Sequence, residues 1–337
     1  MEHSEADSEY LEFARFEEDE IGKVKTEYLE VFPKKLVNKV PSPDIPMDYS
    51  MNPYQGCEHG CVYCYARPTH EYWGYSSGMD FESKILVKKN APDLLRRELA
   101  SRAWVPKPIL LSGNTDCYQP AEQKFKITRE LLKIALEFRQ PIGIITKNSL
   151  ILRDLDILSE LQKRNLIRVT MSITSLDEST RRILEPRTAS CKNRVEAVRK
   201  LTEIGIPTSV NLAPIIPGIN DHEIPEIMKA VSEAGAVRAT YIMCRLNGPI
   251  KEIFEDWLQH HFPDRAQKVM NQIADLHGGK TEDFRFRTRM RGEGNIAESI
   301  RRLFLIHHKM YFEPKVEIGK MDTSQFRRIR KGQLPLF

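Results

Sequence analysis

Short β-branched runs alternate along the chain with longer segments in which apolar residues recur every three or four positions. The first pattern is typical of buried strands and the second of amphipathic helices. The predicted strands are a first one near Tyr49–Tyr54, followed by Ile109–Ser112, Ile142–Thr146, Ile167–Thr174, Thr208–Ala213 and Val237–Met243. The helices predicted between them are Ala91–Ala103, Thr128–Phe138, Leu152–Arg164, Lys192–Ile204 and Glu223–Ala234. The pattern therefore predicts a βα repeat with parallel strands.

Parallel strands joined by helices form either a barrel or a doubly wound sheet, and periodicity alone does not separate the two. In a parallel barrel, functional groups gather where the strands end and the βα loops begin. We therefore expect the site on the loops that follow the predicted strands.

Three cysteines lie within eight residues in the segment NPYQGCEHGCVYCYAR, residues 52–67. Cys57, Cys61 and Cys64 supply soft sulfur ligands, which suit an iron–sulfur cluster or zinc. A closed zinc site takes four ligands, and His59 is a candidate fourth. A [4Fe–4S] cluster held by three cysteines instead leaves one iron open to another ligand.

The spacing C-x3-C-x-aromatic-C, here Cys57, Cys61, Tyr63 and Cys64, resembles the signature of the radical S-adenosylmethionine (SAM) enzymes. The resemblance implies a partial (β/α)6 barrel whose cysteines hold a [4Fe–4S] cluster. It also implies that SAM chelates the open iron with its adenine beside Tyr63. A one-electron donor such as flavodoxin or ferredoxin then drives reductive cleavage of SAM and hydrogen abstraction from a substrate, with the protein supplying orientation and shielding.

Polar residues gather after the later strands, where the resemblance implies contacts with SAM. A turn with a helix cap, a surface ion pair or core packing would also explain them. Lys147 after the third strand either neutralises a carboxylate or begins a turn. The candidate cofactor contacts are Thr115, Asp116, Ser172, Thr174, Glu185, Arg187 and Asn211.

The pieces NPYQGC, CYAR, TDCYQPAE, TK, SIT, EPR and NLAPIIPG, within residues 45–250, are similar to the branch that contains spore photoproduct lyase. That enzyme reverses a thymine–thymine lesion in DNA and returns a hydrogen through a protein thiol. The resemblance makes Cys117 the candidate hydrogen donor, ahead of Cys191 and Cys244. A buried, chemically inert thiol is the alternative.

Composition fits one large intracellular α/β domain with extensions. The chain has 337 residues, of which 41% are hydrophobic, and its six cysteines form no regular framework. No leading apolar segment or membrane-length apolar run is present, so we expect a cytoplasmic protein with no membrane partner.

Charge is distributed unevenly, although the net charge is only +4. The first thirty residues hold eleven acidic against three basic residues, which predicts a mobile acidic tail within an N-terminal extension, residues 1–44. A barrel is expected over residues 45–280. Residues 281–337 reverse the balance with thirteen basic against seven acidic residues, which predicts a basic helical C-terminal extension. Such a segment either binds a polyanion such as DNA or is simply solvated.

The chain ends in Gln333-Leu334-Pro335-Leu336-Phe337, which resembles the peptide that docks bacterial DNA-repair proteins on the sliding clamp. A pull-down with and without these five residues tests that partner. Three hypotheses follow for the whole chain: a radical SAM enzyme acting on nucleic acid, one acting on a peptide or small molecule, or a non-catalytic metal-bearing module that binds nucleic acid.

Overall fold

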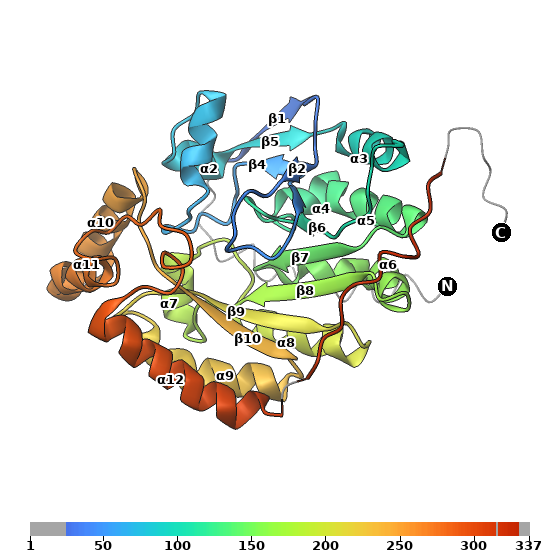
Figure 1. Ribbon diagram of the computed structural model, residues 1–337. Coiled ribbons are helices and arrows are strands. Elements are labelled where there is room, and N and C mark those ends of the chain that lie inside the picture. Colours follow the sequence, from blue (N-terminus) through green and yellow to red (C-terminus); the bar gives the residue numbers. More distant parts are fainter. Residues whose placement is uncertain (1–24, 315, 330–337) are drawn as a thin grey trace.

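The computed structural model describes residues 25–314 and 316–329 and centres on one open seven-stranded sheet (Figure 1). The strand order is β10-β9-β8-β7-β6-β3-β2. The strands are β2 (Asn38–Lys39), β3 (Tyr49–Met51), β6 (Ile109–Leu111), β7 (Ile142–Thr146), β8 (Ile167–Ser172), β9 (Thr208–Ile215) and β10 (Arg238–Met243). Neighbours from β3 to β10 are parallel, and β2 pairs antiparallel with β3.

The six parallel strands confirm the predicted partial barrel. They lie in chain order, as expected where each strand is joined to the next by a crossover on the same face. β3 and β10 stand at opposite ends of the parallel set and do not pair with each other, so the barrel is open.

Helices fill the crossovers and bury one apolar stripe each. In α5, the buried residues Leu131, Leu132, Ala135 and Phe138 recur at the spacing of one helix face. The predicted helix at Leu152–Arg164 begins as a 3-10 turn, η2 (Ser149–Asp154), where the Asn148 side chain accepts a hydrogen bond from the Leu150 amide. The α-helices of the crossovers are α3 (Ala91–Ala100), α4 (Ala121–Phe125), α5 (Ile127–Phe138), α6 (Leu155–Gln162), α7 (Glu178–Leu184), α8 (Cys191–Glu203) and α9 (Ile224–Glu233, after the 3-10 turn η3 at Asp221–Glu223).

A second, three-stranded sheet was not predicted from the sequence. Its central strand β5 (Lys84–Lys88) runs parallel to β1 (Glu27–Val31) and antiparallel to β4 (Tyr54–Gln55). The predicted first strand near Tyr49–Tyr54 is confirmed over Tyr49–Met51 but ends early, because the chain leaves the large sheet after Met51 and joins the small one at Tyr54. Pro53, which lies between them, has no amide hydrogen for a ladder.

The prediction of a mobile acidic tail over the first thirty residues is wrong for its last four residues, because β1 places residues 27–31 in the small sheet. Its pairing with β5 fixes the backbone there, from Glu27 opposite Lys84 to Val31 opposite Lys88. Residues 1–24 lie outside the described residues.

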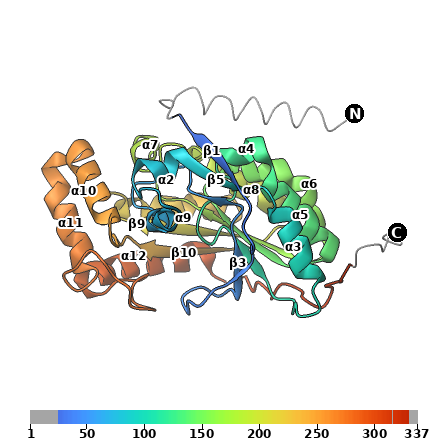
Figure 2. The same ribbon diagram turned by 90° about the horizontal axis from the view of Figure 1, so that it is seen from above.

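A helical unit stands beside the open barrel. It contains α10 (Ile250–His261), the 3-10 turn η4 (Pro263–Arg265) and α11 (Ala266–Asp275), and Figure 2 shows it at the end of the molecule opposite α5 and α6. Its apolar residues form a separate core cluster that includes Cys61, Tyr63 and Leu184. The cysteine segment is therefore packed against this unit.

The basic C-terminal extension contains one long helix, α12 (Gly294–Phe312), which packs against α9 and β10. The ring of Phe304 lies 4.6 Å from that of Tyr241 on β10, measured between centroids. Within residues 25–314 and 316–329, no helix has both the length and the apolar character needed to cross a bilayer.

After α12, the chain crosses the end of the sheet at which the parallel strands begin (Figure 1). The Asp322 amide donates to the carbonyl of Asn165 at 3.0 Å, and the Arg327 amide donates to that of Phe138 at 3.0 Å. The Arg328 guanidinium donates to the carbonyl of Trp104 at 3.1 Å. These carbonyls precede β8, β7 and β6, so the segment covers the amino-terminal ends of these strands and leaves the opposite ends free.

Candidate functional site

The cysteine segment follows β4 directly and is held by backbone contacts. The Cys57 amide donates to the carbonyl of Phe81 at 2.8 Å. Gly56 precedes it with φ +79°, and a Cβ there would lie 2.9 Å from the carbonyl oxygens of Phe81 and Lys84. Glycine is therefore required for this strand exit, both by its left-handed backbone and by its close packing.

Arg67 fixes the cysteine segment from within, and sequence reasoning did not assign it a role. Its buried guanidinium donates to the carbonyls of Cys61 at 3.0 Å, Gly60 at 3.1 Å and Gly78 at 2.9 Å, and pairs with Glu82 at 2.9 Å. One side chain thus joins the cysteine segment to the start of α2 (Met79–Ser83). The position of Arg67 directly after the cysteines was the feature of the sequence that could have indicated this role.

Cys57, Cys61 and Cys64 all line one cavity of about 440 Å³ at the carboxyl ends of the parallel strands. Burial raises the pKa of all three thiols, and neighbouring thiols raise the pKa of Cys57 and Cys61 further. The predicted contacts Tyr63, Thr115, Asp116, Ser172 and Asn211 line the same cavity.

The ring of His59, the candidate fourth zinc ligand, is close to Asp116 and Asn148. His59 Nδ1 lies 3.6 Å from Asp116 Oδ2, and its Nε2 lies 3.4 Å from the Asn148 amide nitrogen. Across the described ranges 25–314 and 316–329, no three Cys, His, Asp or Glu side chains are grouped to hold a single metal ion.

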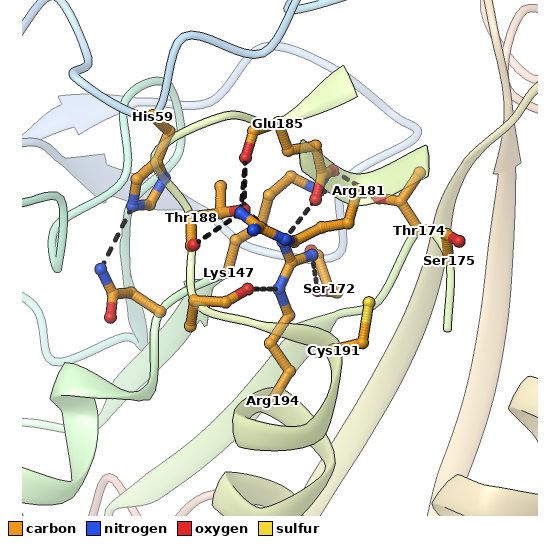
Figure 3. Close-up of polar contacts among 12 residues, drawn as sticks. His59, Lys147, Ser172, Thr174, Ser175, Arg181, Glu185, Thr188, Cys191 and Arg194 are labelled. Carbon is orange, nitrogen blue, oxygen red and sulfur yellow. Dashed lines mark hydrogen bonds and ion pairs between the residues drawn. The ribbon is translucent and has the colours of Figure 1, made fainter. Parts of the chain in front are cut away.

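Glu185 is the centre of a buried polar cluster that includes Lys147, Thr174 and Arg194 (Figure 3). Arg194 reaches it from α8 at 2.5 Å, Lys147 from the end of β7 at 3.3 Å, and Thr174 Oγ1 lies 2.6 Å away. The Tyr63 hydroxyl also donates to the Glu185 carboxylate. Burial alone would raise the pKa of Glu185, but the charges of Arg194 and Lys147 and the hydrogen bonds of Thr174 and Tyr63 hold it well below its usual range.

The contacts in this cluster indicate that Thr174 and Glu185 have a structural role and do not contact the cofactor directly. Both lie outside the cavity wall, and their polar atoms are bound to protein groups. They fix the ring of Tyr63, which does line the cavity. Lys147 neutralises a carboxylate, the first of the two roles that the sequence left open.

Asp116 is also bound largely by its own chain. Its carboxylate accepts hydrogen bonds from the Lys147 amide at 2.7 Å, the Thr146 hydroxyl at 2.8 Å and the Tyr118 amide at 2.8 Å. These bonds tie the loop after β6 to the end of β7. Thr115 donates to the carbonyl of Tyr54 at 2.7 Å, which ties the same loop to β4.

Ser172 on β8 and Asn211 on β9 are paired in register and both line the cavity. The side-chain oxygen of Asn211 accepts a hydrogen bond from Thr240 at 3.2 Å. Within the described part of the chain, the Ser172 hydroxyl and the Asn211 amide nitrogen have no hydrogen-bond partner, so these two polar groups are available to a bound molecule.

Arg187 and Cys117 lie away from the cavity wall. Arg187 donates to the carbonyl of Glu82 at 3.2 Å and supports α2. Cys117 is fully buried in the main core, where burial raises the pKa of its thiol well above the usual value.

Of the wall formed at the end of β10, sequence reasoning named only Cys244, as a lower-ranked candidate thiol. Met243, Cys244 and Arg245 line the cavity there, and Met290 with Arg289 lines it from the extension. The Met243 amide donates to the carbonyl of Met290 at 3.0 Å, which holds the extension against the strand end. Cys244 and Arg245 directly follow the last predicted strand. Polar residues after the other predicted strands were chosen for that same position, so the sequence could have identified this loop too.

The chain belongs to the radical SAM superfamily, whose family model matches residues 51–231. An uncharacterised protein of Mycobacterium tuberculosis is 32% identical over 242 residues, which cover 71% of each chain. A Pseudomonas phage M6 protein described as a radical SAM Nalpha-GlyT isomerase is 26% identical over 174 residues, 51% of this chain and 34% of its own.

The fold also resembles a solved structure of spore photoproduct lyase complexed with dinucleoside spore photoproduct. The TM-score is 0.62 with 16% sequence identity, covering 86% of this chain and 80% of the lyase. The predicted superfamily is confirmed by the family model, and it implies SAM and an iron–sulfur cluster as cofactors, whereas the likeness to the lyase shows a shared fold.

Glu185→Gln should destabilise the fold in a pH-dependent way. The change leaves Arg194 buried without its carboxylate, and breaking a buried ion pair in this way costs about 3–5 kcal/mol. Because the pKa of Glu185 is lower in the folded chain, its contribution is complete above about pH 4.5 and declines as the pH falls further. Urea unfolding of the apo protein at about pH 7 and about pH 3.5 measures this.

Glu196→Gln is the matched control, because Glu196 lies on α8, the helix of Arg194, and pairs with Arg199 at the surface. It should change the free energy of unfolding by less than about 0.5 kcal/mol at either pH. Equal effects of the two substitutions at neutral pH would contradict a structural role for Glu185.

Proposed function

We propose that this protein holds a [4Fe–4S] cluster with Cys57, Cys61 and Cys64, binds SAM in the adjoining cavity, and abstracts hydrogen from a nucleic-acid substrate. The observation that carries this proposal is the placing of all three thiols on one cavity wall at the strand ends. When bound, the cluster supplies the electron for reductive cleavage of SAM. The donor set fits it, because thiolates are the usual ligands of iron–sulfur clusters.

The protein's own residues would position SAM in two ways. Ser172 and Asn211 would contact it directly, since their free polar groups face the cavity, and Tyr63 would lie beside the adenine. Thr115, Asp116, Thr174, Glu185 and Arg187 would act by fixing the loops that carry these contacts, with Thr115 and Asp116 also forming part of the wall.

A nucleic-acid substrate is favoured by the structural likeness to spore photoproduct lyase, whose complex contains a dinucleoside lesion. Several arginines of the C-terminal extension give no further support for nucleic-acid binding, because they are already engaged within the protein. Arg285 pairs with Asp283 and Glu293, Arg289 pairs with Asp44, and Arg327 binds backbone carbonyl oxygen. The hydrogen-donor role of Cys117 stays a prediction, because its thiol lies in the core.

The proposed cell compartment is the cytoplasm, where the reducing conditions suit thiolates and a flavodoxin or ferredoxin electron donor. The clamp-docking peptide Gln333–Phe337 lies outside the described residues, and it stays a prediction.

The cluster assignment predicts that anaerobic reconstitution with iron and sulfide gives a [4Fe–4S]⁺ electron paramagnetic resonance signal that SAM perturbs. Dithionite and SAM should then yield 5′-deoxyadenosine. Cys57→Ala should abolish both results, because only two thiolates remain, whereas Cys191→Ala, outside the cavity, should retain them. A Cys57→Ala variant that still cleaves SAM would overturn the assignment.

Ser172→Ala and Asn211→Ala should each retain the cluster and weaken SAM binding. Losing one neutral hydrogen bond costs about 0.5–1.5 kcal/mol, which is about 2- to 10-fold in affinity. SAM titration of the cluster signal measures this, with Ser159→Ala on α6, outside the cavity, as the control. Unchanged affinity in both variants would place the SAM contacts elsewhere.

The substrate class is tested by deuterium transfer. Reconstituted enzyme, SAM and dithionite are incubated with ultraviolet-irradiated DNA carrying deuterated thymine, and the 5′-deoxyadenosine is analysed by mass spectrometry. We expect deuterium in that product and an altered nucleoside in the digested DNA. Active SAM cleavage without transfer from this DNA, or from undamaged deuterated DNA or RNA, would contradict a nucleic-acid substrate.

A further inference from the structure

Arg245 lies on the cavity wall and has two guanidinium nitrogens without a hydrogen-bond partner among the described residues. It follows β10 and lines the cavity wall formed by Met243 and Met290. Its Nε and Nη1 atoms are shielded from the protein surface, and among residues 25–314 and 316–329 neither has a hydrogen-bond partner. Buried donors without partners are uncommon and unfavourable, which makes these two nitrogens candidates for binding a ligand.

The other basic side chains of the cavity wall are already paired. Lys147 lies 3.3 Å from Glu185, and Arg289 lies 2.7 Å from Asp44. Arg245 forms no ion pair within the described part of the chain. Burial and the nearby charge of Arg289 lower the pKa of its guanidinium, and the smaller opposing effects of Tyr65, Asp44 and Asp283 do not offset them.

The backbone beside Arg245 is fixed on both sides. The Cys244 amide donates to the carbonyl of Ile215 at 2.9 Å, and His277 Nε2 lies 2.8 Å from the Cys244 carbonyl oxygen. The Leu246 amide donates to the carbonyl of Thr281 at 2.8 Å. A charged group on so constrained a backbone is preorganised for its ligand.

The surroundings of Arg245 suit a nucleotide. Tyr65 lines the same cavity with an exposed ring, and its hydroxyl donates to the carbonyl of Gly113 at 3.0 Å. That bond fixes the ring while its face stays open, and bases stack on aromatic rings. A guanidinium presents parallel donors that match two oxygens of a phosphate.

We propose that Arg245 is a substrate-binding residue that takes a phosphodiester group of the nucleic acid and sets which nucleotide lies beside the cysteine wall. The identity of the anion rests on the proposed nucleic-acid function. The existence of an anion site at Arg245 rests on the unpaired nitrogens alone, so the two are tested separately.

The first experiment tests the anion site with inorganic phosphate as the probe. Thermal unfolding of the reconstituted protein is followed against phosphate concentration at constant ionic strength, with and without SAM. Wild type should gain thermal stability in both conditions. Arg245→Gln should lose the gain, Arg245→Lys should retain part of it through its point charge, and Arg302→Gln on the exposed face of α12 should match wild type.

The second experiment tests the phosphodiester. Calorimetric titration compares thymidylyl-thymidine with its uncharged methylphosphonate analogue on the SAM-loaded protein. Wild type and Arg302→Gln should prefer the phosphodiester by about 10- to 100-fold, the effect of one charge-assisted interaction, and Arg245→Gln should show no preference. Arg245→Lys keeps the test valid if the glutamine variant does not fold.

The outcomes separate the two claims. An Arg245-dependent phosphate effect without binding of either dinucleotide would support the anion site and refute its role in binding a phosphodiester, while deuterium transfer decides the nucleic-acid function. A phosphodiester preference that survives in both Arg245 variants would overturn the inference and leave the function standing. Displacement of phosphate by SAM in wild type would also overturn it, because Arg245 would then serve the carboxylate of the cofactor.

Discussion

The buried ion pair of Glu185 and Arg194 is the interaction on which the site depends. Arg194 comes from α8 and Glu185 from the loop after α7, and their atoms meet at 2.5 Å in the interior. Lys147 and Thr174 link the same carboxylate to the ends of β7 and β8, and both also contact the carbonyl of Ala213 on β9. Several strand ends are therefore held by one charge.

Such a pair contributes placement more than net stability. Removing two charges from water costs several kcal/mol per ion, and their attraction restores that only with good geometry and further hydrogen bonds. Here the further bonds come from Thr174 and Tyr63, so the cluster also fixes a ring on the cavity wall. Arg67 fixes the cysteine segment in a similar way, but its guanidinium binds backbone carbonyl oxygens as well as a carboxylate.

The sequence predicted those parts of the molecule that depend on local pattern. The strand Ile142–Thr146 has the predicted bounds, because its continuous apolar run is buried between two parallel neighbours. The small sheet was missed because β1 lies in an acidic segment and pairs with β5, whose residues are distant in the chain. The cysteines were identified from spacing alone, which needs no tertiary information.

The roles of individual polar residues were not predictable in the same way. Asp116 and Asn211 both follow the pattern of polar residues near strand ends. Only the fold shows that the Asp116 carboxylate is engaged by Lys147, Thr146 and Tyr118, while the amide nitrogen of Asn211, another residue of the cavity wall, has no partner among the described residues. Whether a polar atom is used by the protein or free for a ligand depends on contacts between distant segments.

The same distinction governs the arginines. A count of basic residues pointed to the extension as the surface for a polyanion, but Arg285, Arg289 and Arg327 are engaged within the protein. A paired guanidinium has already lost much of its attraction for a further anion, because the nearby carboxylate compensates its charge. Arg245 lies outside that extension and contributes only one charge to the total, yet two of its nitrogens are unpaired. Affinity for an anionic substrate therefore depends on which cations remain unpaired at the cavity, and net charge does not identify them.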